Sequence, residues 1–365
     1  MKWSTLPGPA NFISDVVEQL RDGISVIVAA PTHAPVEMAA VFSETLRRDH
    51  WSIETGTADE QMDPLRWLTE LLYLEPDQWV GWSVEKLFKQ LPDGRAIVID
   101  GVTASTWEAW RSFLMDFEVA SRGHATGLRP VLLVVVRGVP RKRLQAPGAA
   151  LALRTWHGVF GELDTLIYVD QRLRALRKRA RHHKLLVRQI AALALWDLDL
   201  ADFLLAQPEQ DLFEPSTVLQ AGRDALHRED APIGAEWERG GVDQFDGVEM
   251  VHSFVLLNQG DQKLELVRRL WSAQAAELLP LIELRRRELA KGLERHVKCP
   301  FWLGGDRQVR SLDELEIGPL AHVARTNAVD PALRDRADRL AEYRNTLAHL
   351  KLLGCGEALD SRLHA

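Results

Sequence analysis

The chain has 365 residues and a formal net charge of -7, and 46% of its residues are hydrophobic while 27% are charged. This composition is typical of a folded protein and excludes a disordered chain, and the length predicts two or three domains. Because acidic residues outnumber basic ones, bulk charge gives no attraction to DNA or RNA. A nucleic-acid site would therefore have to be a local basic patch.

Cysteine content and hydropathy indicate a cytoplasmic protein. The two cysteines, Cys299 and Cys355, form no C-x-x-C pair and cannot build a disulfide framework, which favours a reducing compartment. The first residues carry no apolar signal core. The longest apolar run, 131–136, is far shorter than the ~20 residues of a membrane helix. We therefore expect no membrane segment, and the sequence indicates neither metal ligands nor a cofactor.

Residues 1–170 alternate strand-like and helix-like patterns. Near-continuous apolar strands of this kind are buried on both faces, as in a parallel sheet covered by helices. The segments between them, such as 106–120, have helical length and composition. The sequence therefore predicts a doubly wound α/β domain with a mostly parallel sheet, whose strands are 25–30, 51–55, 96–100, 130–137 and 165–170.

The pattern changes after residue 170, where no strand run of comparable strength follows. Residues 171–260 predict a helical connector that begins with a basic helix, and residues 261–365 predict an all-α domain. Pro280 is expected to kink or divide the first long helix of that domain, and Gly354 to end the last one. The three expected helices are about 261–296, 312–325 and 331–353.

The loop after the first predicted strand occupies the place of a phosphate-binding P-loop. The P-loop motif, G-x-x-x-x-G-K-[ST], uses glycine backbone N–H groups, a lysine and a magnesium-binding hydroxyl. Here Ala30 and Pro35 take the glycine positions, Val36 takes that of the lysine and Glu37 that of the hydroxyl. Pro35 has no N–H to donate, and the carboxylate of Glu37 repels phosphate. We therefore expect no ATP hydrolysis.

The third predicted strand ends in Asp100, as a Walker B strand does. With this aspartate and the strand order, residues 1–170 resemble a P-loop or AAA-type NTPase domain whose catalytic loop is degenerate. Such a domain is expected to sense or dock a partner, or to regulate by binding nucleotide without turnover. The alternative is an unrelated α/β domain in which Asp100 caps the following turn.

The last predicted helix separates an apolar stripe from a polar face. Leu340, Tyr343, Leu347 and Leu350 fall on one side at ~100° per residue, and Arg344 lies on the flank of this stripe. Asn345 and His349 are four residues apart and therefore stack on the opposite face. The sequence thus predicts a polar pair beside a guanidinium, presented away from the core.

The segment from Arg344 to His349, with Asn345 directly after the arginine, resembles the R-x-x-x-x-H motif of HEPN domains. The first long predicted helix resembles that of HEPN domains found beside NTPase modules in bacterial defence systems, and the resemblance lies in segments 270–274, 279–283 and 285–287. Segment 316–318, on the following helix, also resembles these domains. The resemblance covers about residues 261–357.

The resemblance implies metal-independent RNA cleavage by attack of a ribose 2′-OH on the adjacent phosphate. Histidine titrates near neutral pH, which suits His349 to moving a proton, and the fixed donor fork of Arg344 suits the charged phosphorane. Asn345 orients the histidine or the phosphate. The family further implies a homodimer and protein partners in a bacterial anti-phage or conflict system. The alternatives are a non-catalytic HEPN scaffold that binds RNA or protein, and an Arg–His pair that only binds the last carbonyls of its helix.

A basic cluster in the connector is the candidate RNA-contacting surface, because phosphates supply the affinity for cationic side chains. The alternative is an ordinary solvated helix face. Its candidate residues are Arg172, Arg174, Arg177, Lys178, Arg179, Arg181 and Lys184.

Overall fold

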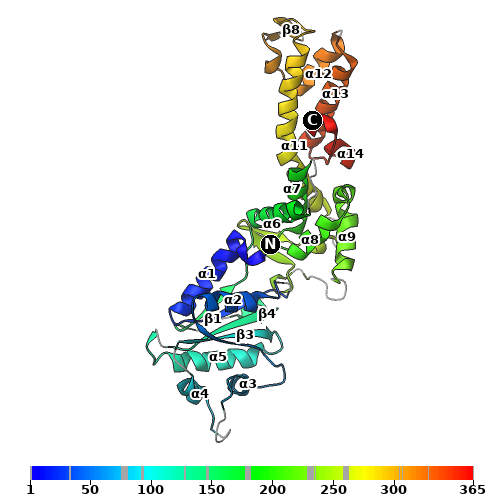
Figure 1. Ribbon diagram of the computed structural model, residues 1–365. Helices are drawn as coiled ribbons and strands as arrows, with labels where there is room; N and C mark the ends of the chain where they lie inside the picture. Colours follow the sequence, from blue (N-terminus) through cyan, green and yellow to red (C-terminus); the bar gives the residue numbers. More distant parts are fainter. Residues whose placement is uncertain are drawn as a thin grey trace. The chain divides into compact units, whose positions relative to one another are not determined.

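The computed structural model groups the chain into two compact units (Figure 1). The α/β unit contains Met1–Asp164 and Ala231–Val255, and the helical unit contains Thr165–Asp230 and Leu256–Ala365. Residues of the predicted connector therefore contribute to both units. The structure describes residues 2–32, 34–74, 81–91, 94–126, 129–144, 148–176, 182–227, 234, 236–257, 263–303, 305, 307–327 and 329–364.

The core of the α/β unit is a five-stranded sheet in the order β2-β3-β4-β1-β5, and all its neighbouring strands are parallel. The predicted parallel sheet is therefore confirmed. Its strands β1 and β4 are buried except at Arg137, because helices cover both faces. The strands are β1 (Ser25–Ala30), β2 (Ser52–Thr57), β3 (Arg95–Thr103), β4 (Val131–Arg137) and β5 (Leu151–Thr155).

Two groups of helices cover the sheet (Figure 1). On one face α5 packs with α3 and α4, and its Trp110 and Phe117 join Ile97 and Val134 of the strands in one apolar cluster. On the other face lie α1 and α2. The elements of this unit other than the five strands are η1 (Trp3–Thr5), α1 (Pro7–Arg21), α2 (Met38–Arg48), α3 (Pro64–Leu71), α4 (Val84–Gln90), α5 (Trp107–Ser121), η3 (Arg141–Arg143), η5 (Trp237–Arg239), β6 (Val242–Phe245) and β7 (Val248–Val251).

The fifth strand differs from the prediction. Residues 165–170 belong to helix α6 (Glu162–Ala175), and β5 lies earlier in the chain. Thr165, Tyr168 and Val169 are buried at helical spacing, and a short apolar run of this kind fits a helix as well as a strand. The true strand contains Arg154 and pairs with only one neighbour, β1, so it lacks the continuous apolar signal of a central strand.

The helical unit is built around the long helix α11, which packs against α7, α12 and α13. A two-stranded hairpin, β8–β9, follows α11 in the chain. Within the described residues, no helix is long and apolar enough to cross a membrane. The elements from the end of the sheet onward are α6, α7 (His183–Ala194), α8 (Leu198–Ala206), η4 (Glu209–Phe213), α9 (Pro215–Ala225), α10 (Ser253–Leu257), α11 (Lys263–Leu293), β8 (Phe301–Leu303), β9 (Arg307–Val309), η7 (Leu312–Glu314), α12 (Ile317–Thr326), α13 (Pro331–Ala348), α14 (Cys355–Ala358) and α15 (Ser361–His364).

Two helix boundaries differ from the prediction. Pro280 does not divide α11, which continues through it; Pro280 is exposed, so water reaches the carbonyl that loses its helical partner. Helix α13 ends at Ala348 rather than near 353, because Leu350 adopts a left-handed backbone with φ of 58°. The N–H groups of Leu350 and Lys351 then donate to the carbonyls of Leu347 and Thr346, both at 3.1 Å, which is the Schellman stop.

Candidate functional site

Arg344 and Asn345 lie near the end of α13, and His349 is the C-cap residue of that helix. Asn345 and His349 are exposed, and the side chain of Arg344 is 43% exposed. On the other side of the helix, the core contains the following buried side chains of the predicted stripe: Leu340, Tyr343 and Leu347. Leu350 is 65% exposed, contrary to the prediction, because the chain has already left the helix there. The polar residues of the motif are therefore accessible to solvent.

Helix α11 fixes the end of α13. The indole Nε1 of Trp271 donates to the carbonyl of Leu347 at 2.7 Å. Gln274, which is fully buried, donates to the carbonyl of Leu353 at 3.0 Å and accepts from its N–H at 2.8 Å. Both residues belong to segment 270–274 of the family resemblance. These bonds satisfy backbone groups at and beyond the helix end, so the motif is held by the rest of the unit.

Tyr343, which directly precedes Arg344, is buried and connects α13 to the C-terminal segment. Its hydroxyl donates to Asp360 at 2.6 Å. Burial, and then the hydrogen bond to Asp360, raise the pKa of Tyr343 to about 12, so it stays protonated at neutral pH. The pKa of Asp360 is lowered despite burial, because Tyr343 and Arg362 both donate to its carboxylate. This network anchors the C-terminal segment to α13.

Arg344 has one acidic neighbour. Its Nη2 lies 3.5 Å from Oε2 of Glu316, the N-cap residue of α12, which is 78% exposed. Within the part of the chain that the structure describes, neither Arg344 nor His349 donates a side-chain hydrogen bond to the last carbonyls of α13. Exposed ion pairs contribute only about 0–1 kcal/mol, so this guanidinium is available to a phosphate that displaces Glu316.

The predicted basic cluster does not form one continuous helix in the described residues. Arg172 and Arg174 lie on α6 and Lys184 lies on α7. Arg172 pairs with Asp202 at 2.8 Å, and Arg174 pairs with Asp170 at 3.0 Å. These carboxylates neutralise the two arginines locally. The other candidate residues fall outside the described part of the chain: Arg177, Lys178, Arg179 and Arg181.

The loop at the P-loop position is bound by an arginine that sequence reasoning missed. Arg137 ends β4, and its guanidinium donates to the carbonyls of Ala34 at 3.0 Å, Pro35 at 2.9 Å and Val36 at 3.3 Å. Its Nε lies 3.6 Å from the carboxylate of Asp100. Asp100 does not end β3 as the sequence predicted, because the strand continues to Thr103. The loop therefore directs carbonyl oxygens at a cation, whereas a phosphate site directs N–H groups at an anion.

Two further backbone hydrogen bonds hold the two sides of this loop. The N–H of Thr32 donates to the carbonyl of Glu238 at 2.9 Å, and the N–H of Gly138 donates to Ala30 at 3.0 Å. Val36 and Glu37 are exposed to solvent at the start of α2.

One sign of Arg137 is visible in the sequence, because it is a single charged residue at the end of an otherwise apolar strand. Its partners are about a hundred residues earlier in the chain, so no local pattern identifies them.

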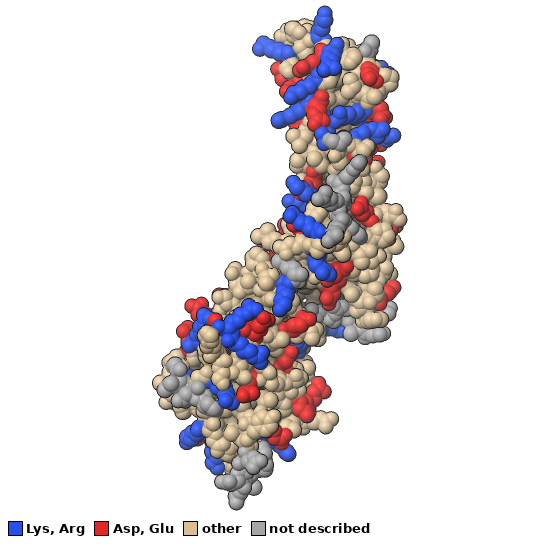
Figure 2. Space-filling view, in the orientation of Figure 1, with Lys and Arg blue, Asp and Glu red and all other residues tan. Residues whose placement is uncertain are grey.

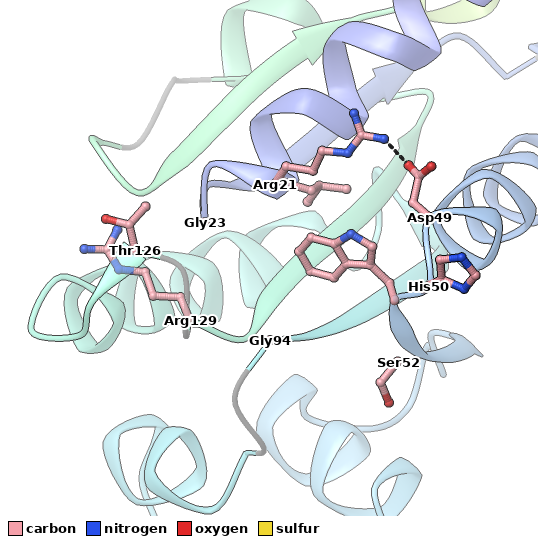
Figure 3. A pocket seen from close by; sticks show the side chains of 10 residues that line it. Arg21, Gly23, Asp49, His50, Ser52, Gly94, Thr126 and Arg129 are labelled. Carbon is pink, nitrogen blue, oxygen red and sulfur yellow. Dashed lines mark hydrogen bonds and ion pairs between the residues drawn. The ribbon is translucent and has the colours of Figure 1, made fainter.

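A surface pocket of about 250 Å³ lies at the opposite edge of the sheet, where the strands begin (Figure 3). Gly23, Trp51 and Gly94, which line it, precede β1, β2 and β3. The two arginines of the lining already have partners. Figure 3 shows Arg21 directed at Asp49, and Nε of Arg129 donates to the carbonyl of His124 at 2.8 Å.

Comparison with known proteins gives no family. No family model matches the sequence, and no curated protein is significantly similar to it. A chain of Drosophila ORC bound to DNA is 12% identical with a TM-score of 0.34, over 56% of this chain and 62% of that one. A single-residue variant of RuvB from Thermotoga maritima is 11% identical with a TM-score of 0.29, over 68% and 92% respectively. The chain thus spans under two thirds of the ORC chain.

Proposed function

We propose that the helical unit is a HEPN-type endoribonuclease module whose site consists of Arg344, Asn345 and His349. The observation that carries the proposal is their common exposure at an end of α13 that Trp271 and Gln274 hold in place. A site of this kind needs a fixed backbone and side chains that reach solvent. Both conditions are met here, and the motif residues are not consumed in packing.

The chemistry is transfer of the phosphoryl group within the RNA chain. The ribose 2′-oxygen attacks the adjacent phosphorus, the bond from phosphorus to the 5′-oxygen breaks, and a 2′,3′-cyclic phosphate and a 5′-hydroxyl result. His349 moves the proton between the two oxygens, since an imidazole can both accept and donate a proton. Arg344 donates to the charged phosphorane, and Asn345 orients the phosphate or the histidine.

A homodimer completes this proposal. Each protomer contributes one motif, and the second copy supplies a second histidine so that an acid and a base act on opposite sides of the phosphate. In the free protein Glu316 holds Arg344 through an exposed contact of 3.5 Å. An RNA phosphate replaces Glu316 as the partner of Arg344, because a phosphate accepts two parallel N–H donors.

The α/β unit is proposed to be a degenerate P-loop-like module that docks a protein partner in a bacterial defence system. Arg137 supports this part of the proposal, because its guanidinium lies among the loop carbonyls where a nucleotide would need N–H donors. The lysine and the hydroxyl of the P-loop motif are also missing, because Val36 and Glu37 occupy their positions. Hydrolysis of ATP is therefore not proposed for this unit.

The second candidate function is a non-catalytic scaffold that binds RNA or protein. The contact between Arg344 and Glu316 favours it, because the phosphate-binding donor of the motif already has an anionic partner. In that case the motif stabilises α12 against α13 and RNA is bound without being cut.

Substitution at the motif separates the two candidates. Arg344→Ala and His349→Ala should each abolish cleavage of a mixed RNA pool without changing the melting temperature, because exposed positions cost within ~0.5 kcal/mol. Leu347→Ala, which empties a fully buried position, should cost about 2–5 kcal/mol. If the two motif variants melt as early as Leu347→Ala, the pair is structural. If the parent protein binds RNA and never cuts it, the scaffold replaces the nuclease.

A further inference from the structure

The β8–β9 hairpin has an apolar inner face and a polar outer face. Phe301 pairs with Val309, and both pack against the core of the helical unit. Trp302 pairs with Gln308, and because side chains alternate along a strand, both point away from that core. Gln308 is exposed and Trp302 is 63% exposed. A large aromatic ring is thus presented to solvent on a short hairpin.

Cationic side chains surround this hairpin. Residues 291–310 contain five Lys and Arg against two Asp and Glu, a formal charge of +3 in a chain whose total is -7. Figure 2 shows Lys and Arg gathered at the end of the helical unit where Figure 1 labels β8. Among the described residues, four exposed cations there have no acidic side-chain partner: Lys291, Arg295, Lys298 and Arg310.

This arrangement differs from the basic cluster that the sequence indicated. There, Arg172 and Arg174 are neutralised by aspartates on neighbouring turns or helices. At the hairpin, a carboxylate oxygen of Glu314 accepts from the backbone N–H of Arg310 at 3.5 Å, and among the described residues the Arg310 guanidinium has no acidic side-chain partner. Arg310 lies two residues beyond Gln308, so the strand alternation carries it toward the face of Trp302.

We propose that the outer face of the β8–β9 hairpin binds single-stranded nucleic acid. One base stacks on the indole of Trp302, Gln308 hydrogen-bonds a base edge, and Arg310 and Lys298 contact the backbone phosphates. Stacking tolerates any base because every base has a π-face, and exposed cations follow the phosphate chain. The surface needs no 2′-hydroxyl and no cleavage, so it goes beyond the proposed nuclease site.

A protein partner is the competing occupant, because Trp and Arg also dominate protein interfaces. Four exposed cations without an acidic side-chain partner in segment 291–310, together with one exposed indole, favour a polyanion, since interface cores are depleted in charge. The hairpin and the nuclease motif also lie near opposite ends of α11: Trp271, which touches the motif, precedes Leu293 by 22 residues, or roughly 33 Å of helix. A hairpin variant therefore leaves the motif unaltered.

The first test measures binding by fluorescence anisotropy of labelled twenty-nucleotide oligo(U) and oligo(dT) at low salt. Trp302→Ala should weaken binding of both by about tenfold, while Trp302→Phe keeps most of the affinity. The matched control is Tyr73→Ala, which removes a 93% exposed aromatic side chain from the α/β unit and should change nothing. Equal affinity of parent and Trp302→Ala overturns the proposal, as does absence of binding to either oligonucleotide.

The second test is the salt dependence. Arg310→Ser and Lys298→Ser should each lower the slope of log affinity against log salt by about 0.7, and Arg48→Ser, an exposed arginine of the α/β unit, should leave it unchanged. The two proposals fail separately, because the hairpin variants are read by binding of oligo(dT), which lacks the attacking 2′-hydroxyl, whereas Arg344→Ala and His349→Ala are read by cleavage of RNA. If Trp302→Ala instead changes only the oligomeric state, the hairpin is a protein interface and the proposal is wrong.

Discussion

At the scale of single residues, Glu316 is the group that competes with an RNA phosphate for Arg344 in the proposed nuclease site. Its Oε2 lies 3.5 Å from the guanidinium, and it is largely exposed. Replacing Glu316 with Gln removes the competing charge at little structural cost. Because such pairs contribute up to about 1 kcal/mol, Glu316→Gln should strengthen RNA binding, and raise cleavage at subsaturating RNA, by about two- to fivefold. Loss of activity in this variant would show instead that Glu316 orients Arg344 productively.

Asp243 gives a pH dependence to the stability of the α/β unit. Its Oδ1 accepts from the N–H groups of Gly158 at 2.9 Å and Gln244 at 2.7 Å, but burial dominates and raises its pKa from 3.8 to about 6. The folded state therefore holds this proton more tightly than the unfolded state. Its contribution is fully present below pH 3.8 and is lost as the pH rises through about 6.

Asp243→Asn tests this dependence, because an amide oxygen accepts the same two hydrogen bonds and cannot ionise. At pH 7.5 the variant should be more stable to urea than the parent, by on the order of 2 kcal/mol. Near pH 3.5 the two proteins should have the same free energy of unfolding. A difference that stays constant across this range would mean that the carboxylate is not the source.

At the scale of elements, the end of α13 depends on Leu350 rather than on Gly354. Leu350 adopts a left-handed φ of 58°, where a Cβ is unfavourable, whereas Gly354 has a φ of -67°. A Cβ on Gly354 would meet only Glu357, at 3.8 Å. Leu350→Gly should therefore stabilise the protein by about 1 kcal/mol, and Gly354→Ala should be near neutral. Urea unfolding of both variants checks this; the reverse order would restore Gly354 as the stop.

The loop between β1 and α2 depends on Arg137. Arg137→Ala removes hydrogen bonds to three carbonyls, and hydrogen bonds from charged groups contribute about 1.5–3 kcal/mol each before relaxation. We expect a lower melting temperature and faster proteolysis of this loop, with no gain of ATP hydrolysis. Arg137→Lys is the control, since one ammonium restores part of the contact. Phosphate release that depends on Asp100 in the parent protein would contradict the degenerate-loop proposal.

Sequence patterns predicted the elements whose signal is local and failed where distant residues decide. The apolar runs of β1, β3 and β4 were found because they are continuous. The segment predicted as the fifth strand belongs to helix α6, because short apolar runs fit either period, and the edge strand β5 was not predicted. The motif side of α13 was predicted correctly from helical spacing. The sequence did not predict the hydrogen bonds of Arg137, Trp271 and Gln274, because each of these side chains binds backbone atoms far away in the chain.

At the scale of the whole molecule, the proposed nuclease acts as a dimer. Cleavage per protomer should then rise with protein concentration and level off where sedimentation shows the dimer to be fully formed. The reason is that each phosphate needs a motif from both copies. Arg344→Ala should leave the dimerisation constant unchanged, because among the described residues its one ion pair is with Glu316 of the same chain. A constant rate per protomer across a range in which the protein is monomeric would contradict the shared site.

The most direct measurement of the central claim uses a DNA oligonucleotide that contains a single ribonucleotide, incubated with the protein in EDTA. The proposal predicts one cut, 3′ to the ribonucleotide, with a 2′,3′-cyclic phosphate and a 5′-hydroxyl as the new ends, because only that sugar carries the attacking oxygen. His349→Ala should leave the strand intact. Cleavage of the all-DNA strand, loss of activity in EDTA, or the same product from His349→Ala would contradict it.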